Sequence, residues 1–287
     1  MREYYVAYSK KCNNDVFSIS DIEYSIIPNR LGTWAADPFI IETTSEEVYC
    51  FAEIWEMKYN KGAIGYCRLD GNNHKWHIAI RENFHMSYPH IFSDGKNYYM
   101  CPEMGKSGEI AIYVAERFPD KWKKLDVLYD GGKNYADTTF FTKDGVQYGF
   151  TYDVANNYST IFTVVNRKIN FVHPNTILSE DGCRPGGNIL HIKDKYIRVG
   201  QLGKPNYGYG LVFKSFNLDV DGYREQTLKE YVPSDFRIAN KLKQQLTGVH
   251  TYNFHKNYAV IDLQMEGWSW NMIVGKIQQK MKLKLFK

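Results

Sequence analysis

The sequence predicts an all-β fold, a five-bladed β-propeller that forms a single domain over residues 1–287. The first observation is a short repeated motif, which we call a phrase. It is seen at 36–41, Ala-Asp-Pro-Phe-Ile-Ile, where a polar or turn-prone residue precedes a short apolar run. Similar phrases open near residues 36, 87, 136, 183 and 248, and their matched positions Pro38, Pro89, Thr138, Pro185 and His250 are separated by 51, 49, 47 and 65 residues. Strand-turn-strand units that recur at about fifty residues are typical of propeller blades.

The second observation is that an aromatic-rich strand follows each phrase after a short turn. We expect these second strands at 48–53, 98–103, 147–152, 196–201 and 258–264, and third strands at 62–69, 108–115, 160–165 and 211–216. The turns between strands, such as 93–96 and 143–145, contain Asp-Gly, which is a strong turn signal. Tyrosine and phenylalanine, present 23 and 16 times, favour the half-buried surfaces of such sheets.

The segments outside the repeats have their own patterns. Residues 2–9 alternate and are aromatic-rich, which predicts a strand that completes the last blade, and 15–27 is a candidate for another strand. Residues 116–122 are expected to form a turn with an aromatic plug. Between blades four and five, 233–246 has helical spacing and is expected to cap a face or cover the pocket. No linker rich in Pro, Gly or Ser divides the chain, which favours one domain.

The net charge and the cysteine content limit the classes of function that the sequence supports. The net charge is only +4 and the two signs are interspersed, whereas a nucleic-acid-binding protein would show a concentrated basic face. The five cysteines are odd in number, lack CxxC spacing and in several cases lie in apolar strands. We therefore expect reduced, buried thiols rather than a disulfide or a metal site. The sequence predicts no cofactor.

The two ends of the chain bear on location. Residues 1–9 lack the apolar core of a signal peptide, and no run approaches the roughly 18–20 apolar residues that cross a bilayer. We therefore expect a cytoplasmic protein. The tail 276–287 carries five lysines interleaved with Ile, Met, Leu and Phe. It is either a basic amphipathic segment that lies on an anionic membrane surface, which would make the protein membrane-peripheral, or a solvated end of the chain.

The innermost strands of a propeller converge on its axis, so polar residues at their starts meet at one mouth of the channel. This set is Asp37, Tyr88, His90, Asp137, Arg184 and His250. Glu53, Glu103 and Asp153 lie at the ends of second strands, and Trp34, Trp55, Tyr88 and Tyr207 are expected to ring the bowl. Aromatic faces pack on the apolar face of a sugar ring while carboxylates accept hydrogen bonds from its hydroxyls, so the set predicts a sugar or glycan as substrate.

Two of these phrases resemble a known superfamily. Ala36–Ile40, which opens blade one, and Asp137, which opens blade three, resemble the five-bladed propeller glycosidases of the arabinanase/β-xylosidase superfamily. This resemblance implies that Asp37 is a general base and that Asp137 tunes the general acid. It also leaves a channel metal open, because some related propellers hold one, although no ligand spacing in this chain demands it.

The sequence is more similar to the N-terminal propeller of glucosamine inositolphosphorylceramide transferases and of bacterial polysaccharide-biosynthesis proteins. The motifs that carry the resemblance are 36–39, 87–89, 99–103, 118–122 (Phe-Pro-Asp-Lys-Trp), 137–139, 184–186 (Arg-Pro-Gly) and 250–251. They span nearly the whole chain. The resemblance implies a bacterial protein of surface polysaccharide or glycolipid biosynthesis.

The chain departs from the glycosidases at blade four, where they place the glutamate that acts as general acid and this chain has Arg184. Loss of that acid slows hydrolysis of an ordinary glycoside by about 10²–10⁴. Either Glu53 or Glu103 supplies the proton from another blade, or the leaving group needs none. A sugar attached to phosphate leaves as a stabilised anion that an arginine can hold. We therefore expect a glycosyltransferase with a sugar-phosphate donor, and a glycoside hydrolase or a non-catalytic glycan-binding propeller as alternatives.

A structural role is the competing interpretation for each site residue. Asp37 before Pro38 is also typical of a turn opener, and Asp137 can cap its strand through the neighbouring threonine hydroxyls. Arg184 can join two blades, and His250 can be a buried channel histidine with satisfied hydrogen bonds. The residues that we expect to catalyse are Asp37, Asp137 and Glu103; those that we expect to bind substrate are Trp34, Glu53, Tyr88, His90, Arg184 and His250.

Overall fold

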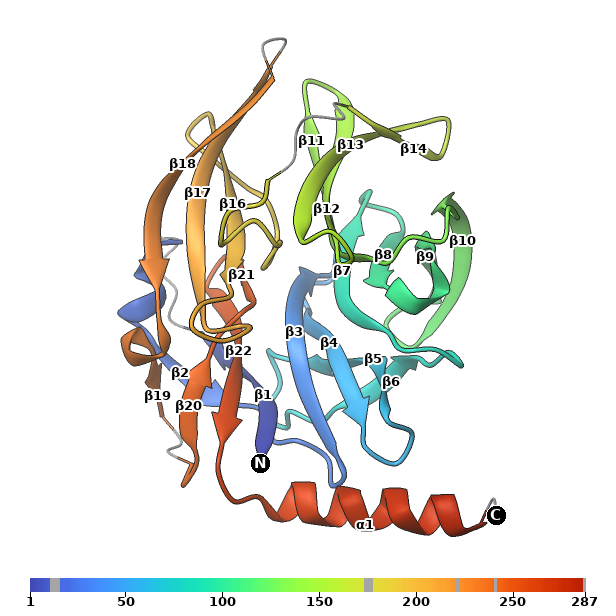
Figure 1. The fold of residues 1–287 in the computed structure, drawn as a ribbon, viewed down its shortest axis with the longest axis vertical. Helices are drawn as coiled ribbons and strands as arrows, with labels where there is room; N and C mark the ends of the chain where they lie inside the picture. Colours follow the sequence, from blue (N-terminus) through green and yellow to red (C-terminus); the bar gives the residue numbers. More distant parts are fainter. Residues whose placement is uncertain (11–15, 173–177, 220–221, 240–241, 286–287) are drawn as a thin grey trace.

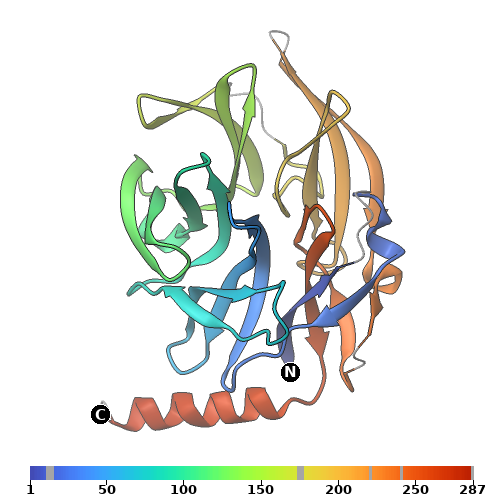
Figure 2. The same cartoon turned by 180° about the vertical axis from the view of Figure 1, so that it is seen from behind.

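Five sheets form the propeller, and their strand pairs are antiparallel except for one parallel pair in the fifth sheet. The computed structural model describes residues 1–10, 16–172, 178–219, 222–239 and 242–285. Figure 1 shows the sheets arranged side by side around a centre, and Figure 2 shows the same ring from behind. The five-bladed all-β propeller predicted from the sequence is confirmed.

The first four blades each contain four strands in sequence order. Blade one is β3 (Thr33–Glu42), β4 (Val48–Glu56), β5 (Lys61–Arg68) and β6 (His77–Ile80). Blade two is β7 (Ser87–Ser93), β8 (Tyr98–Glu103), β9 (Ile110–Arg117) and β10 (Lys121–Tyr129). Blade three is β11 (Tyr135–Lys143), β12 (Val146–Asp153), β13 (Tyr158–Val165) and β14 (Lys168–Phe171). Blade four is β15 (Leu190–Ile192), β16 (Lys195–Leu202), β17 (Gly210–Asp219) and β18 (Gly222–Tyr231).

Blade five joins the two ends of the chain. It contains β21 (Tyr252–His255), β22 (Tyr258–Glu266), β1 (Arg2–Ser9) and β2 (Glu23–Ile26), together with β20 (Gln245–Gly248) and β19 (Arg237–Ile238). Strand β1 pairs antiparallel with β22, from Arg2 opposite Glu266 to Ser9 opposite Ala259. The N-terminal strand therefore completes the last blade, as predicted, and the ring is closed by hydrogen bonds rather than by a covalent link.

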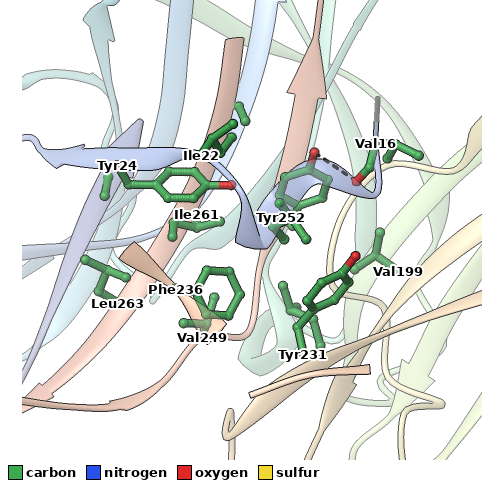
Figure 3. Packing of buried hydrophobic residues seen from close by; sticks show 14 of the residues in the cluster. Val16, Ile22, Tyr24, Val199, Tyr231, Phe236, Val249, Tyr252, Ile261 and Leu263 are labelled. Atoms are coloured by element: carbon green, nitrogen blue, oxygen red, sulfur yellow. Dashed lines mark hydrogen bonds between the residues drawn. The ribbon is translucent and has the colours of Figure 1, made fainter. Parts of the chain in front are cut away.

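The core lies between the blades. Five hydrophobic clusters fill the contacts between blades one and two, two and three, three and four, four and five, and five and one. Figure 3 shows the cluster between blades four and five, where Tyr231 of β18 and Tyr252 of β21 lie near Tyr24 of β2. Because each sheet buries both faces against its neighbours, aromatic and β-branched residues follow one another along the inner strands.

Two details of the packing match the sequence prediction. Phe118 and Trp122 pack between blades one and two, with the Phe118 ring 4.1 Å from that of Tyr98, so residues 116–122 form the expected aromatic plug. Cys50, Cys67, Cys101 and Cys183 are free and buried thiols. The fifth cysteine, Cys12, lies outside the described residues.

The prediction of a helix at 233–246 is wrong. Among the described residues of this segment, Pro233–Asp235 form a 3₁₀ turn, Arg237–Ile238 pair as β19 with β2, and β20 pairs with β22. Two further 3₁₀ turns are Ser18–Ser20 and Gly105–Ser107. The helical periodicity is overridden because the edge of blade five offers unpaired backbone groups to this segment.

The C-terminal tail is an α-helix, α1 (Trp270–Leu285), which lies along the edge of blade one in Figures 1 and 2. It begins at Trp270, earlier than the lysine-rich segment noted in the sequence. In the part of the chain that is described, helices of the length and apolarity needed to cross a bilayer are absent.

Candidate functional site

The openings of blades one, two and three share an unusual backbone conformation. Asp37, Tyr88 and Asp137 have positive φ angles of 53°, 41° and 52°. Each lies where the pairing of its blade's first two strands shifts register, between Ala36 and Phe39 in blade one and at the corresponding places in the others. A left-handed residue in such a bulge redirects its side chain. The fold thereby places three matched side chains around the axis, two of them carboxylates.

Asp37 is held by blade five. Its Oδ1 accepts a hydrogen bond from Thr251 Oγ1 at 3.1 Å and lies 3.3 Å from His250 Nε2. Its Oδ2 accepts the backbone N–H of Tyr88 at 3.3 Å. The other imidazole nitrogen of His250, Nδ1, lies 2.9 Å from Asp262 Oδ2. His250 therefore bridges two buried carboxylates, one from blade one and one from β22.

The charges of Asp37, His250 and Asp262 determine which of these groups are ionised. Burial disfavours an imidazolium, but the carboxylates of Asp262 and Asp37 outweigh it and hold the pKa of His250 well above its usual value. Burial likewise opposes ionisation of Asp37, yet the hydrogen bond and charge of His250 keep the pKa of Asp37 below its usual value. At neutral pH the pair is thus an imidazolium and a carboxylate.

A second ion pair links blades three and four. Arg184 Nε donates a short hydrogen bond to Asp137 Oδ2, and Arg184 Nη2 lies 3.8 Å from Glu103 Oε2. Gln201 Nε2 donates to the same Asp137 oxygen at 2.8 Å and to the carbonyl of Pro185 at 2.6 Å. The predicted Asp137, Arg184 and Glu103 therefore form one cluster.

Two buried glutamates complete the acidic set. Burial, reinforced by the charges of Asp37 and Glu103, raises the pKa of Glu53 well above its usual value. Burial and the charge of Asp137 do the same for the pKa of Glu103. Glu53 Oε1 is buried without a hydrogen-bond partner. The raised pKa values favour the protonated form of both glutamates, which makes them candidates to donate a proton.

His85 lies near Glu53 without forming an ion pair. Its Nδ1 is 3.8 Å from Glu53 Oε1, but the same nitrogen accepts the backbone N–H of Gly62 at 2.8 Å. A nitrogen that accepts a hydrogen bond carries no proton. Burial also lowers the pKa of His85, which agrees with a neutral ring.

Glycines bring blade four onto blade five. A Cβ at Gly187 would stand 2.1 Å from the carbonyl oxygen of Tyr252, and one at Gly186 would stand 2.8 Å from that of His250. Gly187 also has a φ of 153°. The Arg-Pro-Gly-Gly phrase thus permits the close approach that places Arg184 beside the cluster.

Aromatic rings surround the two cations. The Arg184 guanidinium lies over the rings of Tyr152 and Tyr207, 5.2 Å from each centroid. The Tyr207 ring, about half exposed, also lies 5.6 Å from that of His250. These two cation–π contacts help to hold the guanidinium in place.

Trp34 lies beside the cluster with its own aromatic partners. It stacks on Trp55 with ring centroids 5.3 Å apart and planes 1° apart, and Tyr4 packs 5.0 Å away. Tyr4 also contacts His250 edge-on. The three rings form the rim on the side of blades one and five.

The structure places Tyr88 and His90 below the mouth, which differs from the expected contact with a sugar. Tyr88 has no exposed surface, and its hydroxyl lies 2.9 Å from Thr139 Oγ1 and accepts the N–H of Gly187. His90 Nδ1 lies 3.1 Å from Asn188 Oδ1, and its Nε2 accepts the N–H of Phe140. These contacts show that the two side chains join strands of different blades. A buried ring with satisfied polar atoms has no free face to offer a ligand.

A hollow of about 290 Å³ opens beside the cluster. Tyr152, Arg184, Gln201, Gly203, Lys204 and Tyr207 are among its lining residues. It is large enough for a monosaccharide and exposes the guanidinium to incoming groups. A larger hollow, of about 670 Å³, lies between the 3₁₀ turn Pro233–Asp235 and β20.

Asp37, His250 and Asp262 also form a ligand set. One ligand atom from each lies within 4.8 Å of the others. Imidazole nitrogen and carboxylate oxygen suit several divalent cations. A cation bound there would displace one proton from His250, the one on the ring nitrogen that becomes the ligand.

Sequence reasoning missed Asp262, Gln201 and Tyr4 as members of the site. The available signal for Asp262 was a charged residue within an otherwise apolar second strand, since a buried charge without a partner is costly. Gln201 is the corresponding polar residue near the end of β16.

The family described as glucosamine inositolphosphorylceramide transferase 1, N-terminal, matches residues 9–269. Glucosamine inositolphosphorylceramide transferase 1 of Arabidopsis thaliana is 26% identical over 258 residues, which cover 84% of this chain and 32% of the relative. The protein of the same name from Oryza sativa subsp. indica is 28% identical over 207 residues, covering 67% and 27%. The chain thus spans about a third or less of the length of these curated relatives. Both are plant proteins, which goes against the expectation of a bacterial one.

Solved structures with similar folds act on glycans. RS223 β-xylosidase has a TM-score of 0.55 at 10% identity, with 85% of this chain and 96% of that chain covered. The exo-β-1,3-galactanase of Phanerochaete chrysosporium has a TM-score of 0.54 at 12% identity, with 81% and 60% covered. At such identities the likeness shows the fold alone. The sequence match over residues 9–269 shows more: this chain belongs to the family of glucosamine inositolphosphorylceramide transferase 1 N-terminal regions.

Proposed function

We propose that this chain is a carbohydrate-active propeller that transfers a sugar from a phosphate-activated donor during assembly of a surface polysaccharide or glycolipid. The observation that carries the proposal is the position of Arg184, whose guanidinium lies over two tyrosine rings and lines a sugar-sized hollow. Membership of a family named after a transferase supports the same reaction class.

Arg184 is suited to a phosphate. Its guanidinium stays protonated, and the Asp137 carboxylate raises its pKa further although burial opposes the charge. A donor phosphate would exchange with part of the Asp137 contact and form bidentate hydrogen bonds. Lys204, which lines the same hollow, adds a second positive charge.

Asp37 is suited to accept the proton. In the proposed step, the oxygen of an acceptor hydroxyl forms a bond to the anomeric carbon, and the bond from that carbon to the phosphate oxygen breaks. The phosphate departs with the electron pair, and the hydroxyl proton passes to Asp37. The lowered pKa of Asp37 keeps it ionised and ready to accept, and His250 stabilises the carboxylate until then.

Hydrolysis is a second candidate, favoured by one observation. Burial raises the pKa of Glu53, whose Oε1 has no hydrogen-bond partner, so this side chain offers an acid to protonate a departing glycosidic oxygen. Under this alternative Asp37 activates water in place of an acceptor hydroxyl.

Measurements of turnover and binding distinguish sugar transfer, hydrolysis and non-catalytic glycan binding. The purified chain would be incubated with nucleotide- and lipid-phosphate sugars and with neutral aryl glycosides, and released phosphate, transferred sugar and free sugar measured. Transfer predicts sugar bound to an acceptor, lost in Asp37→Asn and Arg184→Gln and kept in Arg117→Gln, a matched change of an exposed arginine. Cleavage of aryl glycosides without dependence on phosphate would support hydrolysis. Glycan binding without either product would show a non-catalytic propeller.

A further inference from the structure

Helix α1 is fixed to the propeller by one side. Asn271 Nδ2 donates to the carbonyl of Thr33 at 2.6 Å, and Asn271 Oδ1 accepts the N–H of Gly32 at 2.6 Å. Gly275 lies so close to blade one that a Cβ there would stand 1.9 Å from Met57 Sδ. Because these contacts set the rotation of the helix, they also define which of its other faces point to solvent.

The face that contains Trp270, roughly 120° around the helix from Asn271 and Gly275, is apolar and open to solvent. Trp270, Ile277 and Met281 follow one another at intervals of seven and four residues, which places them on one stripe of the helix. They are 64%, 50% and 54% exposed. Trp268, 63% exposed, lies just before the helix with its ring 5.3 Å from that of Trp270. Large apolar side chains exposed together mark an interaction surface.

Positive charge flanks the stripe. Lys276 and Lys280 are exposed on the helix, and residues 267–287 contain neither Asp nor Glu. Beside the helix, the half-exposed ring of Tyr59 has three cations over it, namely Lys58 at 5.6 Å, Arg81 at 5.9 Å and Lys282 at 4.4 Å. The surface therefore combines tryptophan, aliphatic side chains and lysine.

We propose that this face of α1 docks on the surface of an anionic membrane. A helix lying in the interface buries its tryptophan and aliphatic side chains among the headgroups while its lysines contact anionic lipids. The helix spans only Trp270–Leu285 and carries lysines along its length, so it lies on a bilayer rather than crossing it. A symmetric second copy fits less well, because the lysines of the two copies would face one another.

Docking of α1 on a membrane would orient the candidate site relative to the lipid surface. Asn271 holds the start of β3 at Thr33, the residue before Trp34, and Asp37 follows on the same strand. The rim formed by Trp34 and Trp55 thus lies on the blade that α1 contacts. This part rests on the proposed function: a membrane lipid would meet the site at the docked edge as acceptor or as donor. Membrane binding itself is independent of that function.

Vesicle sedimentation tests the docking. The full chain would be mixed with phosphatidylcholine vesicles and with vesicles containing a quarter phosphatidylserine. We expect sedimentation with the anionic vesicles only, weakened by salt, and a blue shift of tryptophan emission. Trp268→Ser/Trp270→Ser should lower the partition coefficient at least tenfold, and Lys276→Gln/Lys280→Gln about fivefold for each lysine removed.

Matched variants serve as controls. Leu125→Ser/Leu228→Ser removes exposed leucines from β10 and β18, and Lys75→Gln/Lys96→Gln removes exposed lysines elsewhere; both should sediment like the unaltered chain. Unchanged thermal unfolding would show that every variant is folded. The proposal is overturned if the unaltered chain stays in the supernatant, or if the tryptophan and lysine variants sediment equally with it. If the chain forms a dimer in the absence of vesicles and the tryptophan variant is a monomer, the occupant of this face is a second copy instead. Failure of the proposed transfer reaction would leave these sedimentation results unaffected.

Discussion

His250 Nε2 lies 3.3 Å from Asp37 Oδ1 although 213 residues separate the two in the sequence. Blade five supplies the imidazole and blade one the carboxylate. The pair therefore lies at the junction of blades one and five, where β1 pairs with β22 and closes the ring.

Asp37→Asn should abolish turnover while leaving the fold intact. Asparagine tolerates the left-handed backbone at this position and still accepts the N–H of Tyr88, but it cannot take a proton. We expect kcat to fall by about 10²–10⁴. Asp144→Asn, a change at another left-handed aspartate in an exposed turn, is the matched control and should keep full turnover. Equal rates in both variants would remove Asp37 from the mechanism.

Arg184→Gln should weaken binding of sugar phosphates more than binding of neutral sugars. Loss of a charge-assisted contact costs about 1.5–3 kcal/mol, which corresponds to a rise in Kd of about tenfold to a hundredfold. Titration calorimetry with a hexose 1-phosphate and the parent hexose measures both. Arg117→Gln provides the comparison at a 71% exposed arginine. A similar loss for the hexose alone would mean that Arg184 recognises hydroxyls and not phosphate.

Glu53→Gln should raise the melting temperature at pH 7. Burial raises the pKa of Glu53, so the folded chain keeps its proton while the unfolded chain releases it above about pH 4.5. Stability is therefore lost as pH rises from that value toward the folded pKa, and glutamine removes the loss. The difference in melting temperature should shrink toward pH 4.5. A variant that is less stable than the unaltered chain at pH 7 would indicate an ionised, paired glutamate.

His90 should make the fold acid-sensitive. Burial lowers its pKa to about 4, and its two ring nitrogens are engaged as neutral donor and acceptor by Asn188 and Phe140. Because the unfolded value is about 6.5, stability is full above that pH and is lost as pH falls toward 4, by about 3 kcal/mol. Urea unfolding at pH 7, 5.5 and 4.5 measures the slope.

The control for this slope is a histidine change on the surface. His90→Gln should be less stable at pH 7 yet show a flatter pH dependence. His77→Gln, at an exposed position, should retain the original slope. Parallel slopes in the unaltered chain and His90→Gln would assign the acid sensitivity to other groups.

The sequence predicted the repeat and most of the residues that meet on the axis, because a period near fifty residues fixes which positions are equivalent. Asp37, Asp137, Arg184 and His250 lie together for that reason. Which side chains then pair was not predictable. Asp262 contacts His250 through register within blade five, and no local pattern encodes that partner.

The errors have physical causes too. Tyr88 occupies the position equivalent to Asp37, yet its long side chain reaches across the channel to Gly187 instead of facing the mouth. Residues 233–246 have helical spacing, but β19 pairs with β2 and β20 pairs with β22, so parts of this segment are extended along blade five. In both cases a contact with another blade decided the outcome.

A structure of the chain with bound hexose 1-phosphate tests the central claim most directly. The account predicts phosphate oxygens within hydrogen-bond distance of the Arg184 guanidinium, the sugar ring in the hollow beside Tyr207, and the anomeric carbon facing Asp37. A sugar phosphate bound elsewhere on the propeller, or a site that stays empty at millimolar ligand while the neutral sugar binds, would contradict it.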